Sequence, residues 1–224
     1  KIGFSLEEIK EYMKSYTLDN SIITLRKQLS VLEQQIEELQ MIKSRVEHRC
    51  SQLEHAVSIR EVSDDIMVEN VDKQCILVQK VNAPYSLEQV SIATKECFVR
   101  SFKEQLPVFF QSGAIVPYSR IRQQRYTEAS FAFLPIDIMS NIDGTMELPE
   151  GQCVCTYHTG DYYSIGCSYE RLLAYCSDNK LDIISDSFEF AVNDYLSTKD
   201  ENEYITKIMF YVKNKAQEIN QIPI

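Results

Sequence analysis

An acidic residue lies between two aromatic ones at Phe188, Glu189 and Phe190, within a run that is mostly apolar. Such a run is typical of a strand with buried faces. An ionised carboxylate buried there needs a cation or a hydrogen-bond donor beside it, because the interior solvates charge poorly. Delocalised organic cations supply both charge and apolar area, and aromatic faces attract them further. Glu189 is therefore a candidate ligand-binding residue; the alternative is a strand glutamate that faces solvent, which burial statistics favour.

A second group of residues, Cys153, Cys155 and His158, suggests a metal site. Residues two apart in a strand share a face, so the two thiols can point the same way. The spacing typical of tetrahedral zinc sites is absent, however, and free cysteine is most often a small buried residue. His48 and His55, seven residues apart, are typical of a solvated helix face. We expect structural thiols, with no metal and no cofactor.

No catalytic motif is recognisable in the sequence. Gly160 and Gly166 do not form a phosphate-binding loop, because neither the required spacing nor the lysine is present. No Ser-His-Asp or Cys-His arrangement follows from residue order alone. We therefore expect a binding protein rather than an enzyme.

A heptad repeat runs through residues 21–59, ahead of these candidate residues. Apolar residues alternate at spacings of three and four over about five heptads, which is the pattern of a coiled-coil seam. An ordinary amphipathic helix has a wider apolar stripe and rarely exceeds about 25 residues without a cap. The repeat predicts a rod of roughly 60 Å that pairs with a second copy of the chain, in an orientation that these residues leave open. The predicted dimerisation residues are Ile22, Leu25, Leu29, Leu32, Ile36, Leu39, Val46 and Leu53, with Lys43, Cys50 and Val57 at the remaining seam positions.

Composition narrows the class of protein. The 224 residues are 44% apolar, which is normal for a globular core, and their net charge of −10 is opposite to that of a nucleic-acid-binding surface. No apolar run reaches the roughly 18 residues of a membrane helix, and no signal peptide begins the chain. Seven cysteines scattered through periodic segments favour a reducing compartment. We expect a cytoplasmic protein with no membrane partner.

The first residues predict a short helix that leads into the rod. Ser5 can cap this helix with help from Glu8, and the helix is expected to end near Tyr16. Asp19 or Asn20 is the expected cap of the rod. Because the chain begins with lysine rather than methionine, close to helical sequence, we expect a fragment that lacks most of a small N-terminal domain.

After residue 60 the sequence pattern changes to that of an α+β domain. The order strand, helix, strand, strand occurs twice, which predicts two tandem β-α-β-β units with pseudo-twofold symmetry and a ligand groove where they meet. The expected domains are the N-terminal remnant 1–17, the dimerisation helix 18–60 and the effector domain 61–224. The expected strands are 69–81, 114–121, 130–137, 152–159, 183–195 and 203–213, the helices are 86–105 and 168–177, and 215–224 is a loosely held tail.

This organisation resembles that of one family. Residues 3–10 read GFSLEEIK, which is similar to the end of the winged-helix DNA-binding domain of MerR-type transcription regulators. Residues 185–189 read SDSFE and residues 203–204 read EY, similar to the Ser-Asp-x-Tyr-Glu and downstream Tyr of multidrug sensors. The whole chain thus resembles a BmrR-like MerR family regulator without most of its DNA-binding domain, and its effector domain resembles the GyrI-like fold.

The resemblance implies a site for amphipathic, cationic small molecules. Glu189 would lie at the floor of the pocket and neutralise the ligand, and Tyr204 would form an aromatic wall. Phe188 departs from the family, which often has Tyr at this position. The further candidate ligand-binding residues are Tyr118, Tyr157, Tyr162, Tyr163 and Phe188.

The resemblance also implies the partners of the full-length protein. A homodimer would hold two DNA-binding domains on one promoter, and ligand binding would distort the DNA so that RNA polymerase engages it. Stand-alone domains similar to this effector fold include hydrolases of strained small molecules, in which Glu189 and Tyr204 would do acid–base work. The heptad rod favours the regulator over this alternative.

Overall fold

The computed structural model describes residues 6–14, 17–59, 65–109, 111–137, 142–195 and 197–214. The predicted helix cap at Ser5 and the predicted tail 215–224 lie outside these residues. The chain divides into two compact units, Lys1–His48 and Arg49–Ile224.

The first unit is helical. It contains α1 (Leu6–Lys14) and most of α2 (Leu18–Ile59), whose 42 residues confirm the long helix predicted from the heptad pattern. The predicted cap of this helix is wrong, because Thr17 takes that role. The Thr17 side-chain oxygen accepts a hydrogen bond from the backbone N–H of Asn20 at 3.3 Å, which satisfies one of the free N–H groups of the first turn.

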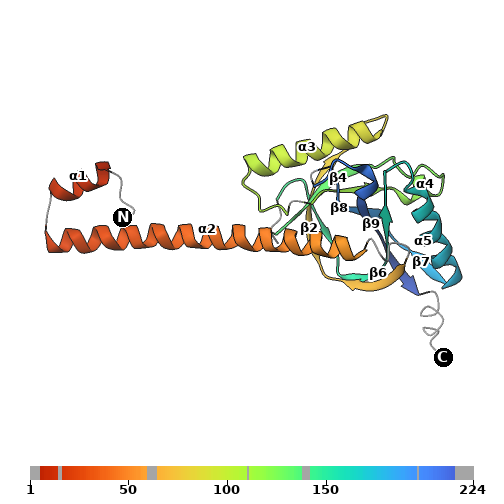
Figure 1. Cartoon of the computed structure of the whole chain (residues 1–224), viewed down its shortest axis with the longest axis horizontal. Helices are drawn as coiled ribbons and strands as arrows, with labels where there is room; N and C mark the ends of the chain where they lie inside the picture. The colour runs from red at the N-terminus through yellow and green to blue at the C-terminus, as the bar shows by residue number, and fades with distance from the viewer. Residues whose placement is uncertain are drawn as a thin grey trace, which may run out of the picture. The chain divides into compact units, whose positions relative to one another are not determined.

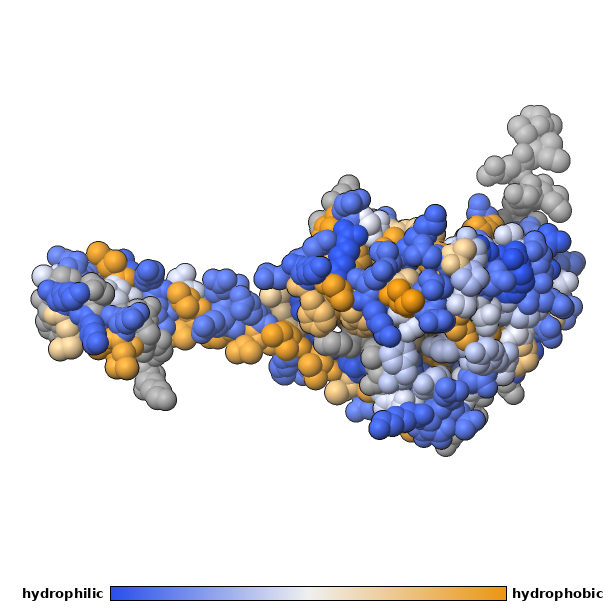
Figure 2. All heavy atoms as spheres, turned by 90° about the horizontal axis from the view of Figure 1, so that it is seen from above, coloured by the Kyte–Doolittle hydropathy of each residue, from blue (hydrophilic) through white to orange (hydrophobic). Residues whose placement is uncertain are grey.

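Apolar side chains recur along α2, as the orange residues of the helical part show in Figure 2. Most of the predicted seam residues are exposed in the single chain, with Leu29 at 57% and Leu39 at 64%, whereas Leu53 is half-buried. Lys43, at a seam position, is also exposed and its ammonium lies 3.4 Å from the Glu47 carboxylate one turn later. The apolar seam of this single chain is therefore accessible to a partner.

The second unit is built on a curled antiparallel sheet (Figure 1). Its strand order is β1-β6-β9-β8-β3-β4-β2-β5, and β7 pairs with β9 outside this path. The strands are β1 (Ile66–Val71), β2 (Gln74–Lys80), β3 (Gly113–Val116), β4 (Phe131–Ile136), β5 (Thr145–Leu148), β6 (Gly151–Thr159), β7 (Leu181–Ile183), β8 (Ser187–Asn193) and β9 (Ile205–Asn214). The helices are α3 (Leu87–Lys103), α4 (Tyr118–Ile121), α5 (Gly166–Asp178) and the short η1 (Glu201–Glu203).

Several predicted elements agree with these bounds. The helix predicted for 86–105 is α3, and its predicted cap is confirmed, since the Ser86 hydroxyl accepts from the Gln89 N–H at 3.4 Å. The helix predicted for 168–177 is α5, and the strands predicted for 130–137 and 152–159 are β4 and β6.

Other predicted strands are wrong in part. The strand predicted for 69–81 is two strands, because β1 pairs with β6 whereas β2 pairs with β4 and β5. The strand predicted for 114–121 ends at Val116, because Pro117 has no N–H for the ladder and begins α4. The strand predicted for 183–195 is divided into β7 and β8, and β5 was not predicted. Pairing with different partner strands therefore decided the division of 69–81, whereas a local residue, Pro117, decided the end of β3.

Both faces of the central strands are buried, which explains why β8 is mostly apolar rather than alternating between apolar and polar residues. On one face, α3 and α5 cover a core that includes Val116, Tyr169 and Phe210. On the other face, Phe188 and Phe190 pack with Ile115, Phe133 and Met209 among others. Because side chains alternate along a strand, Glu189 points toward the helices while its two neighbours point away from them.

Candidate ligand-binding site

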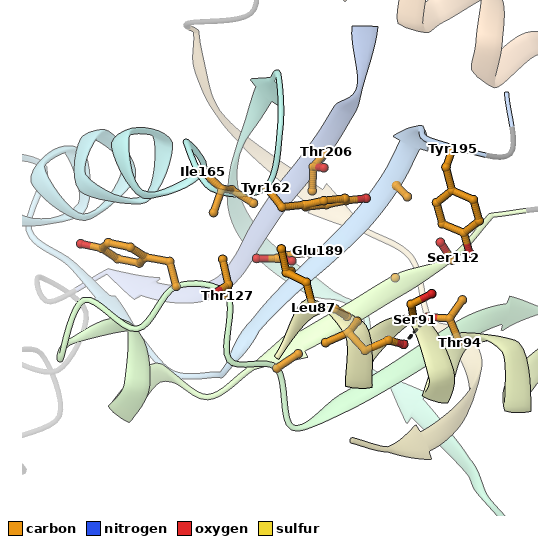
Figure 3. A pocket seen from close by; sticks show the side chains of 16 residues that line it. Leu87, Ser91, Thr94, Ser112, Thr127, Tyr162, Ile165, Glu189, Tyr195 and Thr206 are labelled. Atoms are coloured by element: carbon orange, nitrogen blue, oxygen red, sulfur yellow. Dashed lines mark hydrogen bonds between the residues drawn. The ribbon is translucent and has the colours of Figure 1, made fainter. Parts of the chain in front are cut away.

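A cavity of about 170 Å³ lies between the sheet, α3 and the segment before α5 (Figure 3). Glu189 of β8 contributes the carboxylate of this cavity, and the remaining lining side chains are apolar, aromatic or hydroxylated. These residues are Leu87, Val90, Ser91, Thr94, Ser112, Gly113, Ala114, Tyr126, Thr127, Ala129, Tyr162, Ile165, Ala191, Tyr195 and Thr206.

Glu189 is 8% exposed and is held by a tyrosine from α5. The Tyr169 hydroxyl donates to Glu189 Oε1 at 2.5 Å and lies 2.9 Å from the Ser187 hydroxyl oxygen. Within the described part of the chain, Tyr169 is the one hydrogen-bond partner found for this carboxylate. The second carboxylate oxygen is therefore available to a ligand in the cavity.

Burial controls the charge of Glu189. Removal from water disfavours the ionised form and raises the pKa of Glu189 to about 7, although the hydrogen bond from Tyr169 acts in the opposite direction. A cation in the cavity would favour the ionised form and lower this pKa again. The charge of Glu189 therefore depends on what occupies the cavity.

Aromatic packing holds Tyr169 against the carboxylate. The Tyr126 ring stacks on the Tyr169 ring with centroids 5.3 Å apart, and Phe210 meets Tyr169 edge-on at 6.1 Å. A Cβ at Gly166 would lie 2.8 Å from the Tyr126 ring, so the absence of a side chain at Gly166 allows this stacking. The aromatic groups beneath and beside Glu189 thus come from three separate parts of the chain.

A close approach of two strands shapes the floor of the cavity. Gly113 of β3 pairs with Phe190 of β8, and a Cβ at Gly113 would lie 2.1 Å from the Phe133 ring and 2.5 Å from the Glu189 carbonyl oxygen. Only glycine fits this position without a shift of the backbone or of a core ring.

Two of the candidate ligand-binding residues proposed from the sequence, Glu189 and Tyr162, line this cavity. Tyr204 is buried beside it, with its ring centroid 6.1 Å from that of Tyr162. Tyr163 is 85% exposed, and Tyr118 packs edge-on against Phe210.

The two remaining candidates lie on the other face of the sheet. Phe188 packs against Tyr211 there, and Tyr157 packs with Val192 and Ile205. Successive side chains of a regular strand point to opposite faces of the sheet, so Phe188 and Glu189 cannot face the same cavity.

The sequence interpretation did not include Tyr169, Tyr126 or Tyr195. Tyr169, Leu172 and Cys176 recur at spacings of three and four and are all buried in α5, so helical periodicity could have indicated that Tyr169 faces the sheet. No local pattern indicates that its hydroxyl reaches Glu189.

The cysteine pair of β6 is buried, as predicted. Cys153 and Cys155 are inaccessible to solvent, and burial raises the pKa of both thiols to about 12. The Cys155 thiol donates to Glu69 at 3.5 Å. Among the residues that the structure describes, no three or more His, Cys, Asp or Glu side chains are placed to hold a metal ion.

Comparison with solved structures shows a shared fold. EcmrR in a cryo-EM structure of an EcmrR–DNA complex is similar with a TM-score of 0.57 and 18% identity, over 95% of this chain and 79% of that chain. The crystal structure of the EcmrR C-terminal domain is similar with a TM-score of 0.56 and 14% identity, over 67% of this chain and 98% of that one. A hydrolase from Listeria innocua is more distant, with a TM-score of 0.47 and 10% identity over 67% of this chain and 93% of that chain.

No match was found among curated protein sequences. No helix in the described part of the chain is both long and apolar enough to cross a membrane. The model of the GyrI-like small-molecule-binding domain matches residues 65–213, which form most of the second unit. The chain therefore belongs to the family of GyrI-like small-molecule-binding domains.

Proposed function

We propose that this chain is the ligand-sensing part of a MerR-type transcription regulator and that its cavity binds amphipathic cations. The observation that carries the proposal is a buried carboxylate, Glu189, in a cavity whose other walls are apolar, aromatic or hydroxylated. Such a carboxylate is stabilised by a ligand that supplies positive charge and apolar area together. Membership of a small-molecule-binding family supports a ligand site, and the fold shared with EcmrR supports a regulator.

The size of the cavity limits which cations fit. Pockets for drug-sized ligands have volumes of about 300–1,000 Å³, whereas this cavity has about 170 Å³. A compact aromatic cation is therefore the best probe of the structure as it stands, and a larger ligand requires one of the walls to move.

The end of α2 is bonded to segments that line the cavity, which supports a sensing role. The Arg49 guanidinium donates to the Val192 carbonyl oxygen of β8 at 3.1 Å and to the Ser197 hydroxyl at 2.9 Å. The Gln52 amide donates to the Gln111 side-chain oxygen at 3.1 Å, next to a residue that lines the cavity. A ligand that shifts β8 or this segment would shift the bonds that hold the helix end, and so bias an equilibrium between two states.

The strand order supports the pseudo-twofold architecture. Outward from the β8–β3 pair, one side reads β8-β9-β6-β1 and the other reads β3-β4-β2-β5. In each half of the sheet, the third strand counted outward from the β8–β3 pair is the strand that precedes a long helix in the chain. This strand is β6, before α5, in one half and β2, before α3, in the other. Two tandem strand-helix-strand-strand units joined at the β8–β3 pair would produce this order.

The cation preference is tested with two ligands of nearly equal shape at pH 8, N-methyl-4-phenylpyridinium and uncharged 4-phenylpyridine. We expect the cation to bind at least about tenfold more tightly, because a charge-assisted contact with a buried group contributes about 1.5–3 kcal/mol. Calorimetric titration measures both affinities. Equal affinities, or tighter binding of the neutral ligand, contradict the proposal. The hydrolase alternative is tested separately by chromatography of an ester and epoxide panel after incubation, since Glu189 and Tyr204 would do acid–base work on such substrates if the site were catalytic.

We also propose that α2 pairs with a second copy through its heptad seam, so that the full-length protein meets promoter DNA and RNA polymerase as a homodimer. Exposed leucines along one face of a long helix are stabilised by burial against a partner, by roughly 1.5–3 kcal/mol each. Changing Leu32 and Leu39 together to Asp is expected to convert a micromolar dimer into a monomer in sedimentation equilibrium. Gln34→Asp, on an exposed non-seam position, should leave the dimer intact. If the wild-type chain sediments as a monomer at micromolar concentration, the proposed homodimer is wrong.

A further inference from the structure

A buried histidine lies directly behind one wall of the cavity. His158, near the end of β6, is 3% exposed. Its Nε2 lies 2.9 Å from the backbone oxygen of Asp161, and its Nδ1 lies 3.0 Å from the Ser168 hydroxyl oxygen. Because a carbonyl oxygen only accepts, Nε2 carries the proton. Burial lowers the pKa of His158 and so favours the neutral ring, in which Nδ1 accepts from Ser168.

These two bonds connect three parts of the second unit. Ser168 lies in the first turn of α5, and its oxygen also accepts from the Arg171 guanidinium at 3.2 Å. Asp161 lies in residues 160–165, the segment between β6 and α5. His158 therefore ties this segment and the start of α5 to the edge of β6.

Residues 160–165 form a turn that is organised by polar contacts. The Asp161 carboxylate accepts from the N–H groups of Tyr163 at 2.7 Å and Ser164 at 2.9 Å. The Ser164 hydroxyl donates to the Asp161 backbone oxygen at 2.9 Å and lies 3.3 Å from His158 Nε2. Gly160, with φ of +120°, donates its N–H to the backbone carbonyl oxygen of Tyr204 at 3.0 Å. His158 and Asp161 thus stand at the centre of the contacts that shape this turn.

This turn supplies a wall of the cavity. Tyr162 and Ile165 both line it, and Figure 3 shows the Tyr162 ring close to Glu189, on the side opposite to Leu87 of α3. Thr206 of β9 lines the cavity together with Tyr162. The wall formed by α3 is held by apolar packing against the sheet, whereas the turn is held both by the apolar packing of Tyr162 and Ile165 and by the polar contacts around His158.

We propose that His158 is a positioning residue that determines which size of cation the cavity accepts. By holding residues 160–165 against the end of β6, it keeps Tyr162 close to Glu189 and the cavity small, so that compact cations make contact on all sides. Release of the turn would withdraw Tyr162 and admit bulkier cations. The inference rests on the proposed cation binding at Glu189 and adds the control of ligand size.

The experiment compares N-methyl-4-phenylpyridinium with tetraphenylphosphonium in the wild-type chain and in His158→Leu, which removes both ring hydrogen bonds. We expect affinity for the compact cation to fall about tenfold while affinity for the bulky cation stays the same or rises, so that their ratio changes at least about tenfold. His158→Gln, which keeps an N–H donor for Asp161, should recover part of the wild-type ratio. Tyr163→Ala is the matched control, because Tyr163 lies in the same turn but points into solvent.

Three outcomes overturn the inference. A purely structural role of His158 would lower both affinities by the same factor and leave the ratio unchanged. If Tyr163→Ala changes the ratio of the two affinities as much as His158→Leu does, any substitution in the turn has this effect and His158 has no specific role. If His158→Leu does not fold, Ser168→Ala removes one of the two bonds, and an unchanged ratio in that variant also contradicts the inference. Failure of the wild-type chain to bind either cation would instead overturn the proposed function and this inference with it.

Discussion

Replacing Glu189 with glutamine is expected to weaken binding of N-methyl-4-phenylpyridinium about 100-fold at pH 8. The change removes the negative charge but keeps the shape of the side chain and an oxygen that can accept from Tyr169. Loss of one partner of a buried charged pair typically costs about 2–5 kcal/mol, and a 100-fold loss is roughly 2.8 kcal/mol. Calorimetric titration of the wild type and the variant with the same cation measures the difference.

Glu189→Gln should remain folded, because it places a neutral amide at a buried position where a charged carboxylate is disfavoured. Its thermal unfolding midpoint is therefore expected to equal or exceed that of the wild type at pH 8. Glu96→Gln, on the exposed face of α3, is a matched control that removes the same charge from the same unit outside the cavity. If Glu189→Gln binds the cation as tightly as the wild type and Glu96→Gln do, Glu189 does not neutralise the ligand.

The affinity for the same permanent cation is expected to rise about 50-fold between pH 5 and pH 8. Burial raises the pKa of Glu189 to about 7, so the ionised fraction grows from about 1% at pH 5 to about 90% at pH 8. The neutral form is expected to bind about 100-fold more weakly, as in Glu189→Gln, so the apparent affinity rises with the ionised fraction and becomes nearly constant above pH 8. At pH 7, binding should release about half a proton.

Titration in two buffers with different ionisation enthalpies measures the released proton directly. Burial raises the pKa values of Tyr169 and Tyr162, so neither hydroxyl ionises in this range. Burial lowers the pKa of His158, which opposes its protonation at the acidic end. Glu189→Gln should show a flat profile, which assigns the effect to this carboxylate. A flat profile in the wild type, with no proton released, would mean that Glu189 is already ionised without ligand.

Local sequence patterns were sufficient to predict several helices and strands of this protein. The heptad spacing predicted a long helix and α2 is that helix, because helical periodicity is a property of neighbouring turns. Ser86 and Gln89 predicted the start of α3 for the same reason, since a cap involves only residues three positions apart. The strand predicted for 152–159 is β6, and the mostly apolar run around Glu189, which made that residue a candidate, includes β8.

Tertiary structure decided the composition of the site. Tyr169 reaches Glu189 from α5, Tyr126 stacks on Tyr169 from a separate loop, and Tyr162 comes from a third segment. These residues meet because α3 and α5 cover the same face of the sheet, and that arrangement depends on pairing between strands far apart in sequence. A tyrosine-rich chain offers many candidates, and only the pairing of the strands selects among them.

Glu189 could thus be selected as a candidate ligand-binding residue from the sequence alone, because its residue type and its apolar neighbours are those of a buried carboxylate. The partners of Glu189, the volume of the cavity and the turn behind Tyr162 could not be inferred in this way. They depend on long-range contacts, whose geometry no short stretch of sequence contains.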